Sequence, residues 1–454
     1  MKTVVYSRIG EHRGSIRIWL EGQKLALAGV APGKRFDLVE EGRSIRMVFS
    51  LDGAHTVSRK CRNGREHPVI DIRGKRLEKL FRADDRIRVV VSDDRIEVTL
   101  HHLQRAELER EERARTRVAT GQPLLVGSLA HGGGVLDHAI HRGLAQVGLR
   151  SELAFANEID PEYLDTSLRN NPVWAAKSVA IEGPMEEVEW QHLPKIDLLL
   201  AGLPCTGASL SGRSKNGLRS AEEHETAGTL FFAFLQCTSA LKPSVVVLEN
   251  VPPYQNTVSM TVIRAVLSKM GYDVQERVLN GGDFEALEHR QRLCMVASSK
   301  GLAFPGLDTL APTGAFGGAL GDVLERVPED DPQWKSFSYL ANKEIRDREA
   351  GKGFKRRIVT PESPSVGTIG RGYAKARSTE PFLAHPSDPD MSRLLTPTEH
   401  ARVKTIPAAL VAGVSSTTAH EILGQSIIHN VFQAGGRWIG ESLQQQVQPL
   451  SLAA

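Results

Sequence analysis

Five short apolar runs, separated by helix-length segments, constrain the fold of this 454-residue chain more than any other feature. Each run is rich in Val, Leu or Ile; in order they read PLLVGSLA, SELAFANEI, KIDLLLAG, SVVVLENV and RLCMVAS. Strands that are buried on both faces read as such continuous runs, and helix-length segments between them are typical of βαβ units. From Pro123 onward the sequence therefore predicts an α/β fold, a parallel sheet with helices on both faces.

Polar groups follow four of these runs. HGGG (His131–Gly134) follows the first run, Glu158 ends the second, Cys205 follows the third and Glu249 ends the fourth. The carboxyl ends of parallel strands share one edge of a sheet, and open α/β sheets bind their ligands outside that edge. We therefore expect the four groups to form one active site.

The glycine-rich turn and Glu158 suit a nucleoside-bearing cofactor. Glycines let the backbone approach such a ligand, and a carboxylate accepts hydrogen bonds from both ribose hydroxyls. The chain has no GxGxxG motif and no P-loop lysine, which disfavours a dinucleotide or a triphosphate. HGGG alone is also compatible with a purely structural turn.

Cys205 lies in AGLPCTGAS, where the chain surfaces after a predicted strand. A thiolate there is a strong carbon nucleophile, and Glu249 is an acid that can protonate the group whose electrons the thiolate displaces. The four cysteines contain no CxxC pair, which argues against a disulfide framework or a zinc site, and no metal is expected.

In order along the chain, the motifs resemble those of the cytosine-5 DNA methyltransferases of bacteria and phages. The matching stretches are GSLAHGGGVLD, FANEID, GLPCTGAS, AGTLFF, LENV, HRQRL, RLLTPTEHARV and GQSIIHNVF, between Val126 and about Val431. The resemblance implies a Rossmann-like methyltransferase sheet with S-adenosylmethionine as cofactor. It also implies double-stranded DNA as partner and methyl transfer to C5 of a flipped-out cytosine.

The same resemblance assigns roles to individual residues. Cys205 would add to C6 of the cytosine, Glu249 would protonate or hydrogen-bond N3, and Arg290 and Arg292 would hold the base. The two-residue spacing of the arginines predicts that both lie on one face of a strand. The residues implied to line the cofactor pocket are Gly132, Gly134, Glu158, Ile159, Pro204, Leu230 and Gln425.

The sequence departs from the family pattern mainly around the cofactor. Ala130 stands where relatives have Phe, Val135 where they have a third Gly, and Gln425 where they have Asn. The aspartate of the third motif is missing, with Glu182 a loose candidate, and Glu288 replaces the leading Gln of the arginine motif. These changes indicate a reshaped pocket, weak cofactor binding or a modified donor, and ordinary methyl transfer is the main prediction.

The first hundred residues contain two similar stretches, Ile18–Phe49 and Ile70–Leu100, offset by about fifty residues. Each has a strand, a Gly, a Leu-bearing segment, a turn and a two-strand hairpin. The pattern resembles the small swapped-hairpin β-barrels of bacterial DNA-binding transition-state regulators, here present twice in one chain. A duplicated β unit that dimerises the chain or packs on its neighbour is the alternative.

We expect five regions along the chain. They are a tandem β module (1–100), a charged, solvated linker helix (101–120), a catalytic methyltransferase domain (121–300), a target-recognition domain (301–392) and a C-terminal segment that returns to the catalytic domain (393–454). Within the catalytic region, SLSGRSKNGLRS (Ser209–Ser220) has the composition of a lid over the flipped base, or of a surface loop.

Charge is unevenly distributed. Residues 1–120 hold 26 Lys and Arg against 18 Asp and Glu, while the remainder holds 31 against 36. A second basic stretch, Lys352–Arg377, lies in the predicted recognition region. Two basic surfaces suggest a polyanionic partner, with two solvated faces as the alternative. The absence of a signal-peptide core and of a membrane-length apolar run predicts a cytoplasmic address.

Three other functions remain open on the sequence alone. One branch of the family modifies tRNA, but its Cys-Phe-Thr tripeptide does not occur here. A DNA-binding regulator built on a lapsed methyltransferase would explain the changes around the cofactor, although Cys205, Glu249 and Arg292 are intact. A cytosine-5 alkyltransferase that uses a modified S-adenosylmethionine donor would also explain them.

Overall fold

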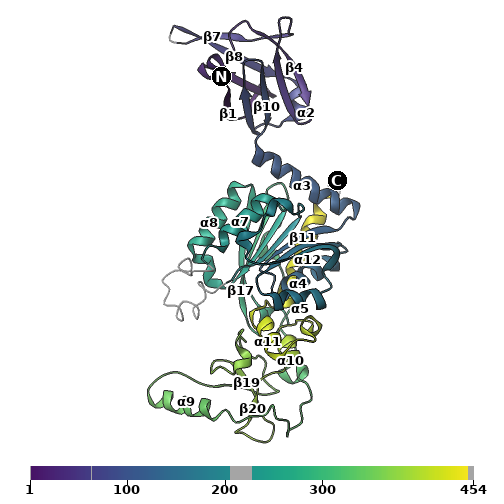
Figure 1. The fold of residues 1–454 in the computed structure, drawn as a ribbon, viewed down its shortest axis with the longest axis vertical. Helices are drawn as coiled ribbons and strands as arrows, with labels where there is room; N and C mark the ends of the chain where they lie inside the picture. Colours follow the sequence, from purple (N-terminus) through teal and green to yellow (C-terminus); the bar gives the residue numbers. More distant parts are fainter. Residues whose placement is uncertain (1, 63, 205–227, 448–454) are drawn as a thin grey trace. The chain divides into compact units, whose positions relative to one another are not determined.

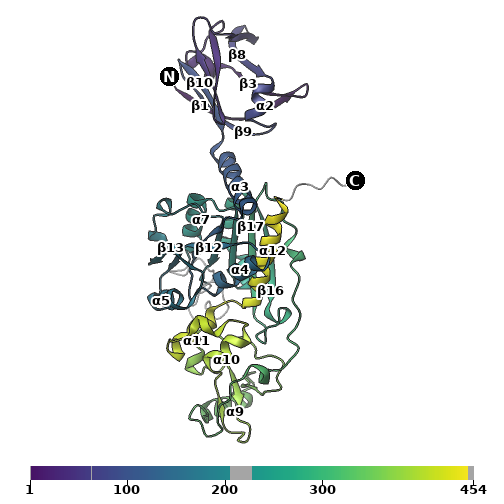
Figure 2. The same ribbon diagram turned by 90° about the vertical axis from the view of Figure 1, so that its right-hand side faces the viewer.

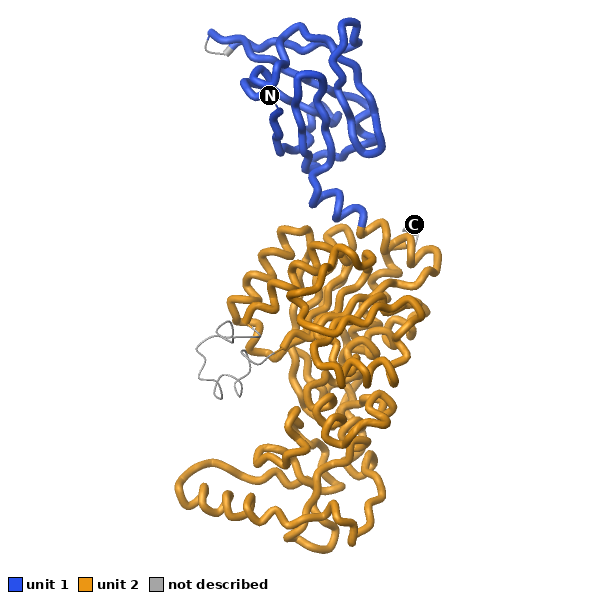
Figure 3. Tube along the Cα trace, viewed as in Figure 1, with its two compact units in different colours: residues 1–109 blue, residues 110–454 orange. Residues whose placement is uncertain are grey.

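The computed structural model describes residues 2–62, 64–204 and 228–447. The chain forms two compact units, Met1–Glu109 and Arg110–Ala454 (Figure 3). Cys205 and the Ser209–Ser220 segment lie outside the described residues.

A seven-stranded sheet forms the centre of the second unit (Figure 1), in the order β13-β12-β11-β14-β15-β17-β16. The strands are β11 (Leu124–Leu129), β12 (Ser151–Glu158), β13 (Trp174–Glu182), β14 (Leu198–Gly202), β15 (Val245–Asn250), β16 (Tyr272–Asn280) and β17 (Gln291–Ser299). Strands β11 to β15 pair in parallel, whereas β17 runs antiparallel to both β15 and β16.

The prediction of a parallel sheet is therefore correct for four of the five apolar runs and wrong for RLCMVAS, which is part of β17. The reason is the short connection between β16 and β17, residues 281–290. A parallel neighbour needs a crossover of a dozen or more residues, usually through a helix, and ten residues allow only an antiparallel return.

Helices cover both faces of this sheet, as predicted (Figure 2). One face carries α4 (Val135–Gln146) and α12 (His429–Gln445), with α5 (Pro161–Asn170) near the sheet edge, and the other carries α7 (Leu230–Leu241) and α8 (Val258–Lys269). Successive residues of a strand point to opposite faces. Accordingly, Leu198 and Leu200 pack in the core with α4 and α12, whereas Leu199 packs in the core with α7 and α8.

The C-terminal segment packs against α4, the first helix of the sheet. It consists of α10 (Pro397–Val403), α11 (Ser416–Gln425) and α12. Helix α12 packs so closely on α4 that a Cβ on Gly143 would lie 2.1 Å from the carbonyl oxygen of Gln433. A Cβ on Gly436 would likewise lie 2.5 Å from the carbonyl oxygen of Ile140. Glycine at both positions allows the two helices this close approach.

Residues between β17 and α10 form a small subdomain with its own core. It contains α9 (Ser338–Glu349) and a three-stranded sheet of β18 (Arg357–Val359), β19 (Pro381–Ala384) and β20 (Ser392–Arg393). Trp334, Val366, Ile369 and Tyr373 are among its buried residues. Three of these, Val366, Ile369 and Tyr373, belong to the basic stretch, so that stretch is partly core and partly surface.

The first unit is a β structure of two sheets around one core. A six-stranded sheet has the order β1-β9-β10-β5-β4-β6 and a four-stranded sheet the order β2-β3-β8-β7. The strands are β1 (Thr3–Arg8), β2 (Gly10–His12), β3 (Ser15–Glu21), β4 (Arg35–Glu41), β5 (Ser44–Phe49), β6 (His55–Thr56), β7 (Ser58–Arg62), β8 (Arg65–Arg73), β9 (Arg86–Val91) and β10 (Arg95–Leu100), with the short helices α1 (Gln23–Leu27) and α2 (Lys75–Leu80).

Equivalent strands of the two similar stretches pair with each other in this unit. β3 pairs with β8 and β5 pairs with β10, and the central pairs are Trp19↔Asp71 and Arg46↔Glu97. The partners in these pairs stand 52 and 51 positions apart, the offset of the two stretches. β1 also pairs with β9, and β6 with β4. Each half therefore lends strands to the hairpin of the other half.

Helix α3 (His102–Thr120) spans the boundary between the units, and its second half packs in the second unit. Arg110 is 1% exposed and donates to the Ser299 hydroxyl at 2.8 Å and to the Gly271 carbonyl at 2.6 Å. Arg113 and Arg117 both form ion pairs with the buried Asp197. The prediction of a solvated linker over 101–120 is therefore wrong for the second half of the helix.

Candidate active site

The turn after β11 brings glycine-rich backbone to the carboxyl edge of the sheet. Ala130, Gly132 and Gly134 have positive φ values of 51°, 57° and 73°. A Cβ on Gly134 would lie 2.4 Å from Asn171 Nδ2, so packing requires glycine there. A Cβ on Gly132 would meet no described atom within 4 Å. The turn is thus closely packed at Gly134 and open at Gly132, where a ligand can approach the backbone.

His131 points into the protein rather than toward the sheet edge. Its Nδ1 lies 3.0 Å from Ser128 Oγ and 3.0 Å from Asp137 Oδ2. Its Nε2 lies 2.7 Å from Ser167 Oγ, and the buried ring meets Trp174 edge-on. His131 therefore stabilises the turn, and of the HGGG motif only the glycines are placed to meet a ligand.

Glu158, at the end of β12, lies directly against this turn. Its Oε2 accepts the Gly132 N–H at 2.6 Å, and its Oε1 accepts the N–H groups of Ile159 and Asp160 at 3.0 Å each. The side chain of Ile159 beside it is 66% exposed, unusually high for a large apolar residue. A carboxylate and an exposed apolar side chain thus adjoin the open glycine, as a ribose and a flat base would require.

Glu249 and Arg292 meet at the same edge because β17 runs antiparallel. The first residues of β17 lie beside the last residues of β15, and Arg292 Nε lies 2.8 Å from Glu249 Oε1. Burial raises the pKa of Glu249, while the charge of Arg292 opposes the rise. A buried carboxyl group with a raised pKa suits an acid that delivers or shares a proton near neutral pH.

Arg290 does not lie on β17, which begins one residue later. The expectation that both arginines share one face of a strand is therefore wrong. Arg290 Nη1 lies 3.2 Å from the Ile369 carbonyl oxygen and 3.4 Å from Glu288 Oε1. Its Nε is buried and has no hydrogen-bond partner among the described residues. Arg290 thus connects the start of β17 with the small subdomain, and one of its donors is unused.

Asn250 fixes the chain just before Cys205, a role that the sequence analysis did not assign. Its Nδ2 donates to the Leu203 carbonyl oxygen at 3.1 Å, and its Oδ1 accepts the Val251 N–H at 2.8 Å. Pro204 follows as an exposed residue, the last described before Cys205. The sequence signal that could have identified Asn250 was its position beside Glu249 in the LENV motif.

The other predicted pocket residues lie on three different elements. Leu230 is the first residue of α7 and is buried, whereas Gln425 is the last residue of α11 and is exposed. Helix α11 contacts the glycine-rich turn, because a Cβ on Gly133 would lie 2.6 Å from Ile422 Cγ2. Glu182 ends β13 in register with Glu158, at the same sheet edge.

Two of the remaining cysteines are unsuited to act as nucleophiles. Cys294 is buried in β17 opposite Glu249, and burial raises its pKa to about 12. Cys237 is buried in α7, where burial raises its pKa further still. Cys61 is exposed on β7 of the first unit. A thiolate forms at neutral pH only where its pKa is not raised in this way.

Sequence reasoning missed a second buried ion pair at this edge, between Glu288 and Lys404. Lys404 Nζ lies 3.1 Å from Glu288 Oε2, and both side chains are 0% exposed. Glu288 drew notice in the sequence only as a departure from the family motif. Lys404, in the otherwise apolar stretch after EHARV, gave no signal, because its partner lies 116 positions earlier.

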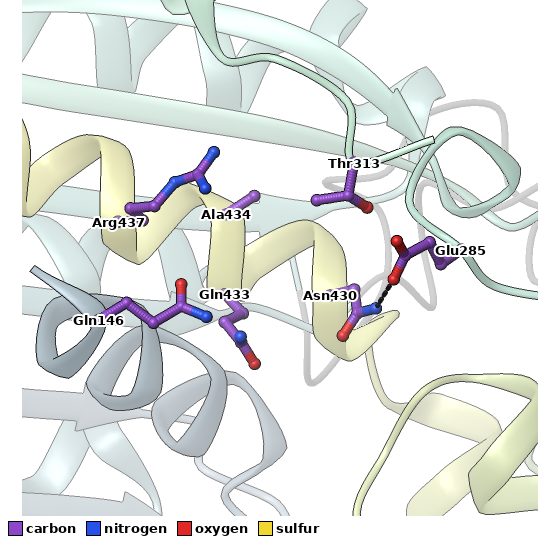
Figure 4. A pocket seen from close by; sticks show the side chains of 7 residues that line it. All are labelled: Gln146, Glu285, Thr313, Asn430, Gln433, Ala434 and Arg437. Carbon is purple, nitrogen blue, oxygen red and sulfur yellow. Dashed lines mark hydrogen bonds between the residues drawn. The ribbon is translucent and has the colours of Figure 1, made fainter. Parts of the chain in front are cut away.

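Other features of the described residues do not compete with this site. A pocket of about 270 Å³ between α4 and α12 (Figure 4) is lined by Gln146, Glu285, Thr313, Asn430, Gln433, Ala434 and Arg437, and includes no predicted site residue. No cluster of three or more His, Cys, Asp or Glu in the described ranges is arranged to hold a metal ion. Within those ranges no helix has the length and apolarity to cross a membrane.

Comparison with known proteins agrees with this geometry. The family model for C-5 cytosine-specific DNA methylases matches residues 131–441, which include both the glycine-rich turn and the returning C-terminal segment. The chain belongs to this family. Methylases of the family transfer a methyl group from S-adenosylmethionine to C5 of cytosine through a covalent cysteine intermediate, and this chain is a methyltransferase of that class.

Individual relatives are similar over the same region. The type II methyltransferase M.NlaX of Neisseria lactamica is 30% identical over 291 residues, which is 62% of this chain and 86% of the relative. The DNA-cytosine methyltransferase of Escherichia coli K12 is 28% identical over 327 residues, 63% of this chain and 68% of the relative.

Solved structures of methyltransferases share the fold. The S. pombe Dnmt2 methyltransferase superposes with a TM-score of 0.57 at 19% identity, over 71% of this chain and 99% of that one. The Entamoeba histolytica methyltransferase EhMeth gives a TM-score of 0.54 at 15% identity, over 72% of this chain and 99% of that one. The methyltransferase fold predicted from the sequence is thus confirmed.

Proposed function

We propose that this chain methylates a cytosine within a specific sequence of double-stranded DNA, with Cys205 as nucleophile and Glu249 as acid. The observation that carries the proposal is the buried Glu249–Arg292 pair at the carboxyl edge. In the sheet, Glu249 pairs in register with Gly202, three residues before Cys205. An acid and the strand that leads to the cysteine therefore lie side by side.

The proposed chemistry starts with addition of the Cys205 thiolate to C6 of the flipped cytosine. Glu249 donates a proton or hydrogen bond to N3, so the electron pair of the 5,6 double bond makes C5 a nucleophile. C5 then takes the methyl group, loses its proton to solvent and expels the thiolate, which restores the aromatic ring. Arg292 orients Glu249 by their contact, and Arg290 holds the base.

S-adenosylmethionine, when bound, supplies the electrophilic methyl group. The residues around the turn fit it: Gly132 faces open space, Glu158 keeps about one carboxylate lone pair beyond its three N–H contacts, and Ile159 exposes an apolar surface. We propose that these three residues, with Gly134 shaping the turn, hold the nucleoside part. Further proposed contacts come from Pro204, Leu230 and Gln425.

The first test is sequencing of methylated cytosines in DNA from bacteria that express the full chain, with Cys205→Ser as the inactive partner. A serine alkoxide is not available near neutral pH, so this variant should leave no methylation. Cys61→Ser, which changes an exposed cysteine of the first unit, should methylate the same sites as the wild type. Methylation by Cys205→Ser would contradict the nucleophile assignment, and an unmethylated genome under wild-type expression would favour a lapsed methyltransferase.

A second test traps the intermediate. DNA that carries 5-fluorocytosine at the target cannot lose fluoride as it would lose a proton, so a covalent adduct through Cys205 should accumulate. Mass spectrometry of the adduct also reports the transferred group. A mass above that of methyl would favour the alternative of a modified donor.

For the first unit we propose nonspecific affinity for DNA through its excess of basic residues, with dimerisation of the chain as the alternative. We further propose a cytoplasmic address, where DNA and S-adenosylmethionine are both present in a bacterial cell. A place in a restriction–modification system is consistent with the type II relatives.

A further inference from the structure

We propose that the buried Glu288–Lys404 ion pair positions the arginines of the active site for the reaction. Glu288 and Lys404 would act as positioning residues, through Arg290 and the start of β17, and would not touch the base. The inference rests on the proposed methyl transfer and deepens it, because it assigns a role to two residues that the catalytic chemistry does not use.

The pair joins two segments that are far apart in the sequence. Lys404 caps the C-terminus of α10, where its Nζ lies 3.1 Å from Glu288 Oε2 and 3.4 Å from the Ser426 carbonyl oxygen. The Glu288 N–H also donates to the Val403 carbonyl oxygen at 3.0 Å. Backbone and side chain of Glu288 are thus both fixed to the segment around Lys404.

Glu288 lies between two cations. Its Oε2 faces Lys404, and its Oε1 faces Arg290 Nη1 at 3.4 Å. The Arg290 N–H donates to the Glu288 carbonyl oxygen at 2.8 Å, and β17 begins at the next residue. Two positions after Arg290, Arg292 contacts Glu249. The position of Glu288 therefore determines where β17 begins, and β17 carries the Arg292 that contacts Glu249.

The charges of the cluster depend on each other. Burial lowers the pKa of Lys404 to about 7, and the Glu288 carboxylate opposes the decrease. Without Glu288, the ammonium would lie fully buried among other cations and would lose its proton. The charged or titratable groups that act on Lys404, or on which it acts, are Glu288, Arg290, Arg292, Glu249 and His400.

A buried ion pair is costly to desolvate and is a weak source of stability, since apolar side chains of similar volume often stabilise as well. Its value here is geometric. The carboxylate offers one oxygen to each cation and so fixes Arg290 in direction, which an apolar contact would not do. This is why we infer a role in the reaction rather than in folding alone.

The test is a double-mutant cycle on full-length protein with Glu288→Gln, Lys404→Gln and the double variant. The readouts are the single-turnover methylation rate with saturating DNA and S-adenosylmethionine, the Kd for DNA, and the melting temperature. Each single variant should lower the single-turnover rate by about 10- to 100-fold, because small displacements of catalytic groups have such effects. The double variant, an uncharged amide pair that can still hydrogen-bond Arg290, should return to within about threefold of the wild type.

Asp197→Asn is the matched control. Asp197 is equally buried and paired with Arg113 and Arg117, but it lies just before β14, at the opposite edge of the same sheet. This variant should melt at a lower temperature with an unchanged single-turnover rate. If Lys404→Gln does not fold, Glu288→Gln compared with Asp197→Asn still tests the proposal, because only Glu288→Gln should lower the single-turnover rate.

Two results would overturn the proposal. The first is that both single variants behave like Asp197→Asn and have lower melting temperatures but wild-type single-turnover rates. The other is a double variant slower than either single variant. An inactive wild type, which the same assay reports separately, would contradict the proposed function and with it the positioning role.

Discussion

At the residue scale, the environment of Glu249 differs from that of a surface carboxylate, because the side chain is buried against Arg292. Burial raises its pKa, while the charge of Arg292 opposes the rise, and a raised pKa favours the acid form that protonation of N3 requires. Glu249→Gln should therefore lower kcat by orders of magnitude with little change in the Kd for DNA, because an amide cannot deliver a proton to N3.

The pH dependence provides a second readout for Glu249. Since its folded pKa is raised, the acid form is complete at low pH and is lost as pH rises through that pKa, and kcat should fall on that alkaline side. Rate measurements across pH should show this limb in the wild type and not in Glu249→Gln. A large loss of DNA binding with unchanged turnover of the bound complex would instead make Glu249 a residue that positions the base.

Ala130 stands where the family pattern leads us to expect Phe, and the structure shows a backbone constraint at this position. Its φ of 51° places a non-glycine residue in the left-handed region, which costs roughly 1–2 kcal/mol. His131 is held inward by Ser128, Asp137 and Ser167, so its ring does not face a ligand at this edge.

Ala130→Phe should consequently tighten binding of S-adenosylmethionine, since an aromatic ring on the adenine adds about 0.5–1.5 kcal/mol beyond its buried area. Calorimetry on wild type and variant measures the difference. Ala130→Gly, which relieves the backbone strain without adding a ring, should raise stability and leave the affinity unchanged. Blocked binding in Ala130→Phe would indicate that the space belongs to a larger donor.

At the scale of elements, the sequence predicts strands better than it predicts what their ends contact. The apolar runs of β11, β12, β14 and β15 are visible without a structure, and so are the groups at their ends. The antiparallel course of β17 follows from a ten-residue connection, but the sequence pattern of an apolar run is the same in either direction. The contact between Glu249 and Arg292 depends on that direction.

Helix α3 shows why the burial of polar side chains is harder to predict. Arg110 reads as one charge among many in a solvated helix, yet it is buried because carbonyl groups near residue 270 and the hydroxyl of Ser299 accept its donors. Its guanidinium carbon also lies over the Tyr272 ring, 3.7 Å from the centroid. Such partners lie more than 150 positions away, and no local pattern identifies them.

Helix α4 and the helices of the returning segment bury several histidines in neutral form, which sets an expectation for the pH dependence of stability. Burial lowers the pKa of His429 to about 3 and those of His141 and His420 to about 4, and it also lowers those of His138 and His400. Four of these histidines form two contacting pairs. His138 Nδ1 lies 2.8 Å from His429 Nε2, and His400 Nδ1 lies 2.9 Å from His420 Nδ1.

Because these folded pKa values lie below the unfolded value of about 6.5, the unfolded chain binds more protons in acid. The stabilisation by neutral histidines is present above pH 6.5 and is lost as pH falls below it. The free energy of unfolding in urea should therefore decrease from pH 7 to pH 5. His429→Gln should reduce the slope, whereas a slope equal to that of the wild type would show that this histidine is not buried neutral.

At the scale of the whole molecule, the uneven charge separates two roles for the first unit. Residues 1–120 carry an excess of eight basic residues, and the remainder an excess of five acidic ones. If the first unit adds nonspecific DNA affinity, each phosphate contact that it makes should contribute about 0.9 to the slope of log K against log salt. If the first unit dimerises the chain, its removal should instead convert a dimer in solution into a monomer.

Deletion of residues 1–101 tests both roles, because it removes all ten strands of the first unit and keeps α3 whole. The shortened chain should stay folded and active, bind DNA more weakly and show a shallower salt dependence. A cut at residue 118 should instead yield an unstable protein, since Arg110, Arg113 and Arg117 would be lost from Ser299 and Asp197.

Lys75→Gln/Lys79→Gln in the full chain is the milder counterpart, since both lysines are exposed on the basic helix α2 and neither belongs to the catalytic unit. If the first unit binds DNA electrostatically, this double variant should have a slope of log K against log salt between those of the wild type and the shortened chain. Its mass in solution should equal that of the wild type. Light scattering of the same samples reports the mass. A salt slope and a mass that both remain unchanged after deletion of residues 1–101 would exclude both roles, because neither phosphate contacts nor a dimer interface would then reside in the first unit.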